Sequence, residues 1–431
     1  MKKIFAFAIA AVTMTVGCQK FQDILKPNNE PVDDGNPVEI KFSTNVATVE
    51  VKGVGAFDKL NTNQDLYIYG IATKKSDAST KVVIENKKAN IGAPAGDDTW
   101  AAPSATGALK FPNNAAYFYS GTKDVHAFYG YYVDDACGYV LDEQGQPKEP
   151  KELKPIEPTA EYKLNITIDG TQDILLGKAN PSEDISGNPT VTTPDDVYSA
   201  WSARNGVTPN LVFDHALTQY TFEVKNLGTK DLALTGVGVT SKTKAVLTVA
   251  GTQGLSEIGT GETADSELAL NNTTGDLWDT EVYTYTTKQM NDNDTPDNTE
   301  DDFEEDVTVS VKGISLPKNG TQSVKIENAS IMTFAAQQNN VVLYLKQEGM
   351  AHGEYRKITI PLNIAALGGK ETTEAGVSYN VQISIYSLEQ IEINVTLNPW
   401  EHETLVIGQD ELDKAGDAND GDYNDVIVPA A

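Results

Sequence analysis

Alternating apolar and polar residues run through most of the chain and predict a fold of short β-strands. The clearest case is Leu211–Asn226, in which two stretches of period two flank a kink at His215–Thr218. Successive side chains of a strand point to opposite faces, so both stretches read as half-buried strands. We interpret this segment as scaffold and place it at the start of the second half of the chain.

Further strands follow from the same period and from runs of β-branched and aromatic residues separated by Asn, Gly and Asp. In the first half they are expected at Glu39–Ser43, Thr48–Lys52, Asp65–Thr73, Ala115–Tyr119, Val125–Val133, Tyr162–Ile168 and Asp173–Gly177. In the second half they are expected at Asp231–Val239, Ala245–Val249, Glu281–Thr287, Val307–Val311, Ser323–Ile326, Val341–Lys346 and Arg356–Ile360.

Two clean strands close the pattern. In Val377–Ile385 and again in Ile391–Leu397 the odd-numbered residues are apolar or aromatic, and Ser387–Gln390 joins the two as a short hairpin loop. No stretch of about 12 residues or more shows a helical period. The sequence therefore predicts an all-β protein built from β-sandwiches.

The length of 431 residues exceeds what one compact core ordinarily organises, and we expect two domains. We place the first at residues 38–200 and the second at residues 201–402. Residues Lys178–Pro209, rich in Asn, Pro, Ser, Asp and Thr, are interpreted as a loop and interdomain connection. Residues 403–431 form an extension after the second domain.

The N-terminus carries an export signal. Two lysines precede an apolar run at Ile4–Val16, which is too short for a membrane-spanning helix of about 20 residues. Cys18 follows small residues at the end of this run, as in a bacterial lipobox, with a plain secretory signal as the alternative. We expect residues 1–17 to be a lipoprotein signal peptide, Cys18 to carry acyl chains such as palmitate, and residues 18–37 to be a tether.

Charge and cysteine content narrow the class of protein. The chain has 62 acidic and 33 basic residues and a formal net charge of −29, which disfavours nucleic acid as a partner because phosphates need a basic surface. Cys137 has no intrachain partner once Cys18 is acylated, so no disulfide framework is expected. Cys137 then reads as a small buried residue.

No catalytic or metal-binding pattern emerges from the sequence. The four histidines are scattered without metal-ligand spacing, and His215 is interpreted as a hydrogen-bonded residue at the strand kink. The acidic stretches Asn291–Asp306 and Asp417–Asp425 miss the calcium-loop template and are interpreted as a solvated loop and a polar tail. We therefore expect neither enzymatic activity nor a metal or other cofactor.

The tyrosine-rich strand Val125–Val133 leaves one alternative open. Its side chains are expected to divide between a core face and a wet face. Tyr129, Tyr131 and Tyr132 could instead form an exposed aromatic platform that stacks on sugar rings, as a glycan-binding surface protein would need.

Several of these segments, taken in order, resemble one family. They are Cys18 in its lipobox-like setting, IKFS near the mature start, AYFY and VHAFYGYYV, DILLG, LVFDHALTQYTFEV, and the closing YNVQISI and IEINVTLNPW, which ends at Trp400. Together they resemble the fimbrillin family, the lipoprotein-derived subunits of type V surface pili in Bacteroides-like bacteria. The similarity runs from about residue 38 to about residue 400.

The resemblance implies a fold and a mode of assembly. Family members consist of two tandem β-sandwich domains of transthyretin-like topology and reach the outer membrane as lipoproteins. A trypsin-like protease removes the first strand, and the exposed groove accepts a strand of the next subunit. Such β-augmentation across a head-to-tail contact does not close, and so it makes a filament.

Mapped onto this chain, the strand to be released is Glu39–Ser43, alone or with Thr48–Lys52, and cleavage would follow Lys52. The donor strand would come from the apolar residues of the extension, which are Thr404, Leu405, Val406, Ile407, Val426, Ile427 and Val428. Alternatively, these residues form the last strand of the second domain or are disordered. Family cleavage typically follows Arg, whereas the first arginine here is Arg204, which leaves room for an anchor subunit that keeps its lipid and its first strand.

The expected function is that of a structural subunit of a cell-surface fimbria that supports adhesion. Its partners would be other fimbrial subunits, in a homo- or heteropolymer, and the outer membrane through the lipid anchor, with a host or glycan ligand at the surface. The alternative is a surface lipoprotein, at an anchor or tip position, that binds a glycan or host ligand without polymerising. Both functions place the protein at the outer membrane and cell surface.

Overall fold

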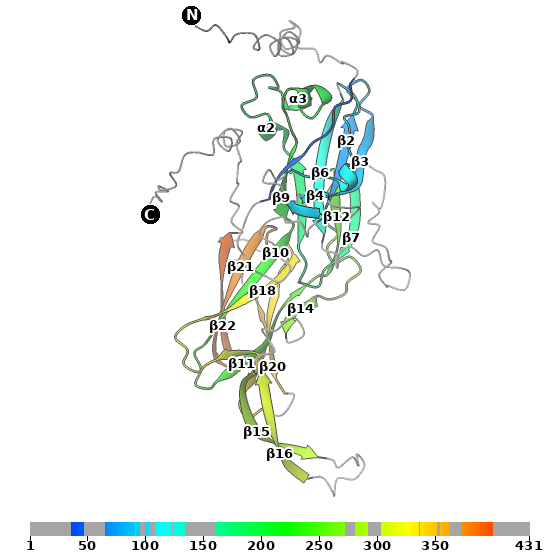
Figure 1. Ribbon diagram of the computed structural model, residues 1–431. Coiled ribbons are helices and arrows are strands. Elements are labelled where there is room, and N and C mark those ends of the chain that lie inside the picture. Colours follow the sequence, from blue (N-terminus) through cyan, green and yellow to red (C-terminus); the bar gives the residue numbers. More distant parts are fainter. Residues whose placement is uncertain are drawn as a thin grey trace, which may run out of the picture.

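A computed structural model of the protein describes residues 36–46, 65–90, 92–94, 100–103, 108–122, 124–133, 161–271, 281–291, 303–335, 337–350, 354–362 and 372–399. Most residues in this part of the chain lie in β-strands, and its longest helix has five residues. The prediction of an all-β sandwich fold is confirmed. Figure 1 shows the strands gathered into two bodies stacked one above the other. Their transthyretin-like topology and their independence as two domains stay predictions.

The first body is built on a six-stranded sheet. Its strands, in order, are β1 (Ser43–Val46), β9 (Asn210–His215), β8 (Ile174–Ala179), β6 (Val125–Val133), β2 (Leu66–Thr73) and β3 (Thr80–Ala89). Neighbouring strands are antiparallel except for β1, which runs parallel to β9. A three-stranded sheet covers part of one face and consists of β13 (Gly254–Ser256), β12 (Lys244–Ala250) and β7 (Tyr162–Thr167).

Irregular chain covers the opposite face of the six-stranded sheet. This cover, defined here as residues 108–119 and 181–207, includes the short helices η1 (Pro112–Asn114), α2 (Pro181–Asp184), η2 (Pro194–Asp196) and α3 (Ala200–Arg204). Ile185, Val197 and Val207 pack with Phe128 and Phe213 of the sheet in one buried cluster. The interpretation of Lys178–Pro209 as an interdomain connection is wrong, because its few, widely spaced apolar residues close the core of the first body.

The second body consists of two sheets. One has the order β18 (Val324–Phe334), β10 (Leu217–Asn226), β21 (Val377–Ser387) and β22 (Gln390–Pro399), in which β10 and β21 are parallel. The other has the order β14 (Ser266–Asn271), β11 (Leu232–Ser241), β19 (Asn340–Gln347) and β20 (Arg356–Pro361), with β17 (Ile314–Leu316) also paired to β11. All seven strand segments predicted from Asp231 onward overlap these strands, β12, or the hairpin described next, and two of them start one residue too early, at Asp231 and Ser323.

A long hairpin projects from the far end of the second body in Figure 1. It consists of β15 (Glu281–Asn291) and β16 (Phe303–Lys312). Near its base, Tyr285, Val309 and Val311 pack with Ala233 of β11. The predicted acidic loop is therefore shorter than Asn291–Asp306, because β16 already begins at Phe303. A separate small hairpin is formed by β4 (Gly92–Pro94) and β5 (Trp100–Pro103).

Strand pairing crosses the expected boundary between residues 200 and 201. β9, β12 and β13 come from residues 201–402 but lie in the first body, and β12 pairs with β7. The predicted kink at His215–Thr218 is the point of crossing: β9 ends at His215 in one sheet, and β10 begins at Leu217 in another. The segment that seemed to start the second half therefore belongs to both bodies.

Candidate strand-exchange groove

The residues that the sequence assigned to export and assembly lie outside the described chain. These are Cys18, Lys52, Thr404, Leu405, Val406, Ile407, Val426, Ile427 and Val428. Lipidation, cleavage and strand donation therefore stay predictions. The described part of the strand to be released is residues 36–46, which we call the first-strand segment.

The first-strand segment is held at its start by the cover and at its end by β9. Residues 38–42 pair with the cover, and β1 then runs parallel to β9 with Ser43 opposite Asn210. The backbone hydrogen bonds of the first part are Ile40 N–H to Tyr117 O (2.7 Å), Tyr119 N–H to Val38 O (3.0 Å) and Leu109 N–H to Phe42 O (3.3 Å). The sequence placed this strand at Glu39–Ser43, whereas its ladder with β9 begins only at Ser43.

Two apolar side chains of the first-strand segment fill the core of the first body. Ile40 is 3% exposed and Phe42 is 2% exposed. The Phe42 ring meets Phe128 edge-on with 5.0 Å between centroids, and Phe111 with 6.2 Å. Full burial of one such side chain contributes about 1.5–3 kcal/mol, so the pair contributes about 3–6 kcal/mol to holding the segment in place.

Hydrogen bonds from residues distant in the sequence hold the walls around the first-strand segment. Arg204 at the end of α3 donates from Nη2 to Asn36 O (2.9 Å). Asp184 accepts from the Tyr198 hydroxyl and from Asn210 N–H (2.9 Å), which ties the cover to β9. Burial raises the pKa of the Asp184 carboxyl, and burial followed by the nearby Asp184 raises the pKa of Tyr198. On the side of the cover, the wall of the groove is thus tied to β9 and to the start of the first-strand segment by hydrogen bonds.

A second edge of interest is β22 in the second body. It pairs only with β21 among the described strands, and Ile391, Ile393 and Val395 are half-buried against the core. The predicted inward face is confirmed for these residues, although Leu397 is 45% exposed. Pro399 ends β22 opposite Val377, next to the junction of the two bodies. In the sequence, the predicted donor residues begin at Thr404, shortly after the end of this edge strand.

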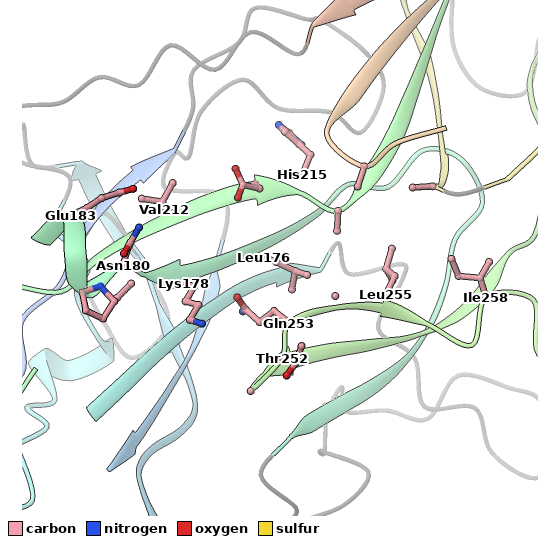
Figure 2. A pocket seen from close by; sticks show the side chains of 18 residues that line it. Leu176, Lys178, Asn180, Glu183, Val212, His215, Thr252, Gln253, Leu255 and Ile258 are labelled. Carbon is pink, nitrogen blue, oxygen red and sulfur yellow. The ribbon is translucent and has the colours of Figure 1, made fainter. Parts of the chain in front are cut away.

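A cleft of about 980 Å³ lies beside the junction, on the face of the six-stranded sheet that faces away from the cover. Figure 2 shows it between β8 and β9 on one side and the β12–β13 hairpin on the other. Its floor is Leu176, Lys178, Val212 and Asp214, and Gln253 with Leu255 forms part of its wall. The Gln253 amide is already used, because it donates to Gly130 O (3.2 Å) and Val249 O (2.8 Å).

The buried histidines of the first body are structural. His215 Nδ1 lies 2.8 Å from Asp173 Oδ2, and Ile174 N–H donates to the other oxygen of Asp173 (2.8 Å). This confirms the interpretation of His215 as a hydrogen-bonded residue at the kink. His126 accepts Ser120 N–H at Nε2 (3.2 Å), so its proton lies on Nδ1, 3.0 Å from Tyr198 O. Burial lowers the pKa of His126 to about 4.

The tyrosine platform suggested by the sequence does not form. Tyr131 is 0% exposed and Tyr129 is 8% exposed, while Tyr132 is half-buried against the cover cluster. Both faces of β6 are covered, because β6 is a central strand with β7 and β12 on one side and the cover on the other. The expectation of one core face and one wet face is therefore also wrong.

The described residues hold no group of three or more His, Cys, Asp or Glu side chains placed to bind a metal ion. None of the described helices is long and apolar enough to cross a membrane.

Comparison with known proteins gives matches among solved structures. No protein-family model and no curated protein matches the sequence. A candidate cell adhesion protein of Bacteroides uniformis is 12% identical over 86% of this chain and 100% of that chain, with a TM-score of 0.40. The fimbrial anchor protein Mfa2 of Porphyromonas gingivalis is 9% identical over 86% of this chain and 100% of that chain, with a TM-score of 0.30. A candidate polysaccharide-binding protein of Bacteroides thetaiotaomicron is 9% identical over 85% of this chain and 99% of that chain, with a TM-score of 0.31. At these identities and TM-scores the matches do not assign the chain to a family.

Proposed function

We propose that the chain is a structural subunit of a cell-surface fimbria, exported as an outer-membrane lipoprotein and joined to its neighbours by strand exchange. The observation that carries the proposal is the first-strand segment. It ends in β1, the edge strand of the six-stranded sheet, and it fills the core with Ile40 and Phe42. The resemblance of the sequence to fimbrillins supports the same function, with no catalytic role and no cofactor.

Removal of the segment would leave a groove that needs a new strand. The edge of β9 would lose its partner, and Phe111 and Phe128 would lose the ring of Phe42. An open apolar groove beside an unpaired strand edge is costly until another backbone fills it with alternate side chains. The apolar runs Thr404–Ile407 and Val426–Val428 of the next subunit are the proposed donors.

The test is the intact mass of the protein recovered from outer-membrane and sheared-surface fractions of the native cell. We expect a species that lacks everything before about residue 53, in polymers of high molecular weight. Lys52→Gln should block this trimming and the polymer, and the matched variant Lys59→Gln should leave both unchanged. A deletion of residues 403–431 should yield trimmed subunits that do not polymerise.

Two results would overturn strand exchange in this form. A polymer whose subunits keep residues 36–46 would exclude removal of the first strand. A lipidated species that starts at Cys18 and never polymerises would favour the alternative, a surface lipoprotein at an anchor or tip that binds a glycan or host ligand. The lack of any arginine before Arg204 would agree with that second result, because the typical cleavage residue is missing there.

A further inference from the structure

The cleft in Figure 2 lies beside β13, which is the last strand of the smaller sheet of the first body in the described part of the chain. The six-stranded sheet has more strands than the three-stranded one, so β7 and β12 cover β2 and β6, whereas β8 and β9 face the β12–β13 hairpin across the cleft. Tyr131 on β6 is fully buried on this face. On the next two strands, β8 and β9, Leu176 and Val212 are only half-buried, and Lys178 and Asp214 are exposed.

The outer edge of β13 borders the cleft and the face of β8 and β9 that lines it. β13 pairs with β12 from Gly254 to Ser256, and no strand in the described part of the chain pairs with its other edge. Gly254 and Leu255 line the cleft. Backbone groups of β13 and the aliphatic floor of the cleft therefore offer the two elements of β-augmentation, a strand edge and pockets for alternate side chains.

We infer that the cleft accepts an extended peptide strand from a partner protein, which adds to the edge of β13 and lies over β8 and β9. The cleft holds about 980 Å³ and lies between α2 and the junction. At about 3.3 Å per residue, a short strand of about five residues spans the body of such a site. Its alternate residues would rest on Leu176 and Val212.

The charged residues that line the cleft determine what kind of partner strand it would accept. The cleft carries one cation, Lys178, against the carboxylates of Asp214 and Glu183, and none of the three forms an ion pair with another described residue. A basic residue on the strand would complement the excess acid. The C-terminal extension of this chain is a poor candidate, because residues 403–431 carry eight acidic residues and one lysine, Lys414. The partner strand is therefore a basic, aliphatic segment of a different protein.

This site is separate from the proposed strand-exchange groove. Ile40 and Phe42 fill the face of the six-stranded sheet under the cover, and the cleft lies on the other face. The inference does not depend on polymerisation, and its test uses the intact, unpolymerised chain.

The probe is a fluorescein-labelled peptide of about eight alternating lysine and valine residues, compared with its glutamate–valine counterpart and with peptides of residues 401–412 and 420–431. We expect the lysine peptide to bind and the other three to bind at least tenfold more weakly. Asp214→Lys should weaken the lysine peptide about tenfold, whereas Glu389→Lys, an equal charge change at the exposed β21–β22 turn, should leave it unchanged. Ala335→Trp, which fills the end of the cleft, should abolish binding.

Hydrogen exchange distinguishes strand addition from loose ionic contact. With the lysine peptide bound, amide protection should rise at Gly254–Ser256 and stay constant in β21. Binding without protection of β13, or binding that Asp214→Lys and Ala335→Trp leave intact, would overturn the inference. Tighter binding of either extension peptide would also overturn it, because the cleft would then accept a second copy of this chain.

Discussion

The surroundings of His126 in the first body hold its imidazole ring in the neutral form. Its ring accepts one backbone N–H and lies within hydrogen-bonding distance of Tyr198 O, an arrangement that satisfies the neutral form. A second proton would have to go on Nε2, where Ser120 N–H already points. Burial and this geometry together oppose the charged ring, so the residue links the stability of the first body to pH.

We predict that His126 makes the protein less stable in mild acid. The ordinary pKa of the ring is 6.5, and the folded value is about 4, so the unfolded chain takes up this proton first as the pH falls. The stabilisation is complete above pH 6.5 and is lost as the pH falls toward 4, with about 3 kcal/mol lost in all. Urea unfolding of the wild type and of His126→Phe, at pH 7 and near pH 4.5, measures how much unfolding free energy each protein loses between the two pH values. The variant should lose less stability than the wild type over this interval, and equal losses would contradict the prediction.

At the scale of elements, the packing of β9 on its neighbours depends on two glycines. Gly130 of β6 and Gly177 of β8 lie opposite one another, and Gly177 also lies opposite Phe213 of β9. A Cβ atom at either glycine would lie 2.6 Å from the Phe213 ring. The missing side chains therefore make the space that the ring of Phe213 occupies.

We predict that Gly177→Ala destabilises the protein by about 1–3 kcal/mol, because the added methyl group overpacks the core against Phe213. Phe213→Leu should relieve part of this cost, since its side chain is shorter. Thermal or urea unfolding of the two single variants and the double variant gives the coupling energy between positions 177 and 213. A double variant whose loss equals or exceeds the sum of the single losses would show that the clash is not with Phe213.

The elements that the sequence predicted well are those in which burial follows the period. Tyr162, Leu164 and Ile166 are buried and alternate with polar residues that are half-buried or exposed, because β7 has one face on the core. β3 was missed, since its lysines and asparagine interrupt the pattern at a sheet edge where little burial is required. Periodicity also gave no sign that both faces of β6 are covered, because what lies over a face depends on segments distant in sequence.

The candidate groove was predictable only in part. The apolar residues of IKFS indicated a strand near the mature start, and the structure buries Ile40 and Phe42. The residues that pack on this strand could not be derived, because the cover comes from segments about 60 to 170 residues away in the sequence. The contact of Arg204 with Asn36 is an example. The cleft beside β13 had no sequence signal, since it results from two sheets of unequal width.

At the scale of the whole molecule, the two bodies share one core. A single buried cluster contains Tyr131 and Leu247 of the first body and Tyr220 and Val381 of the second. Ala216 N–H donates to Ile174 O (2.8 Å) and Gly376 N–H to Leu217 O (2.9 Å), on either side of the Asp173–His215 pair. The junction is therefore packed like an interior and not like a linker.

We predict that the two bodies unfold together. Asp173→Ala leaves His215 and Ile174 N–H without their buried acceptor and should lower the unfolding free energy by about 3 kcal/mol. Hydrogen exchange of peptides from β6 and β21 should report the same loss in both bodies. A loss confined to β6, with β21 unchanged, would mean that each body unfolds on its own.

The parallel course of β1 and β9 determines how the molecule bears tension. A load that enters at the N-terminal end of β1 and leaves through the C-terminal end of β9, where the backbone continues into β10, pulls the two strands in opposite directions along their length. That geometry loads their hydrogen bonds in shear, so they must break together and not one after another. The first strand thus resists a steady lengthwise pull from its N-terminal end far better than it resists being peeled off sideways.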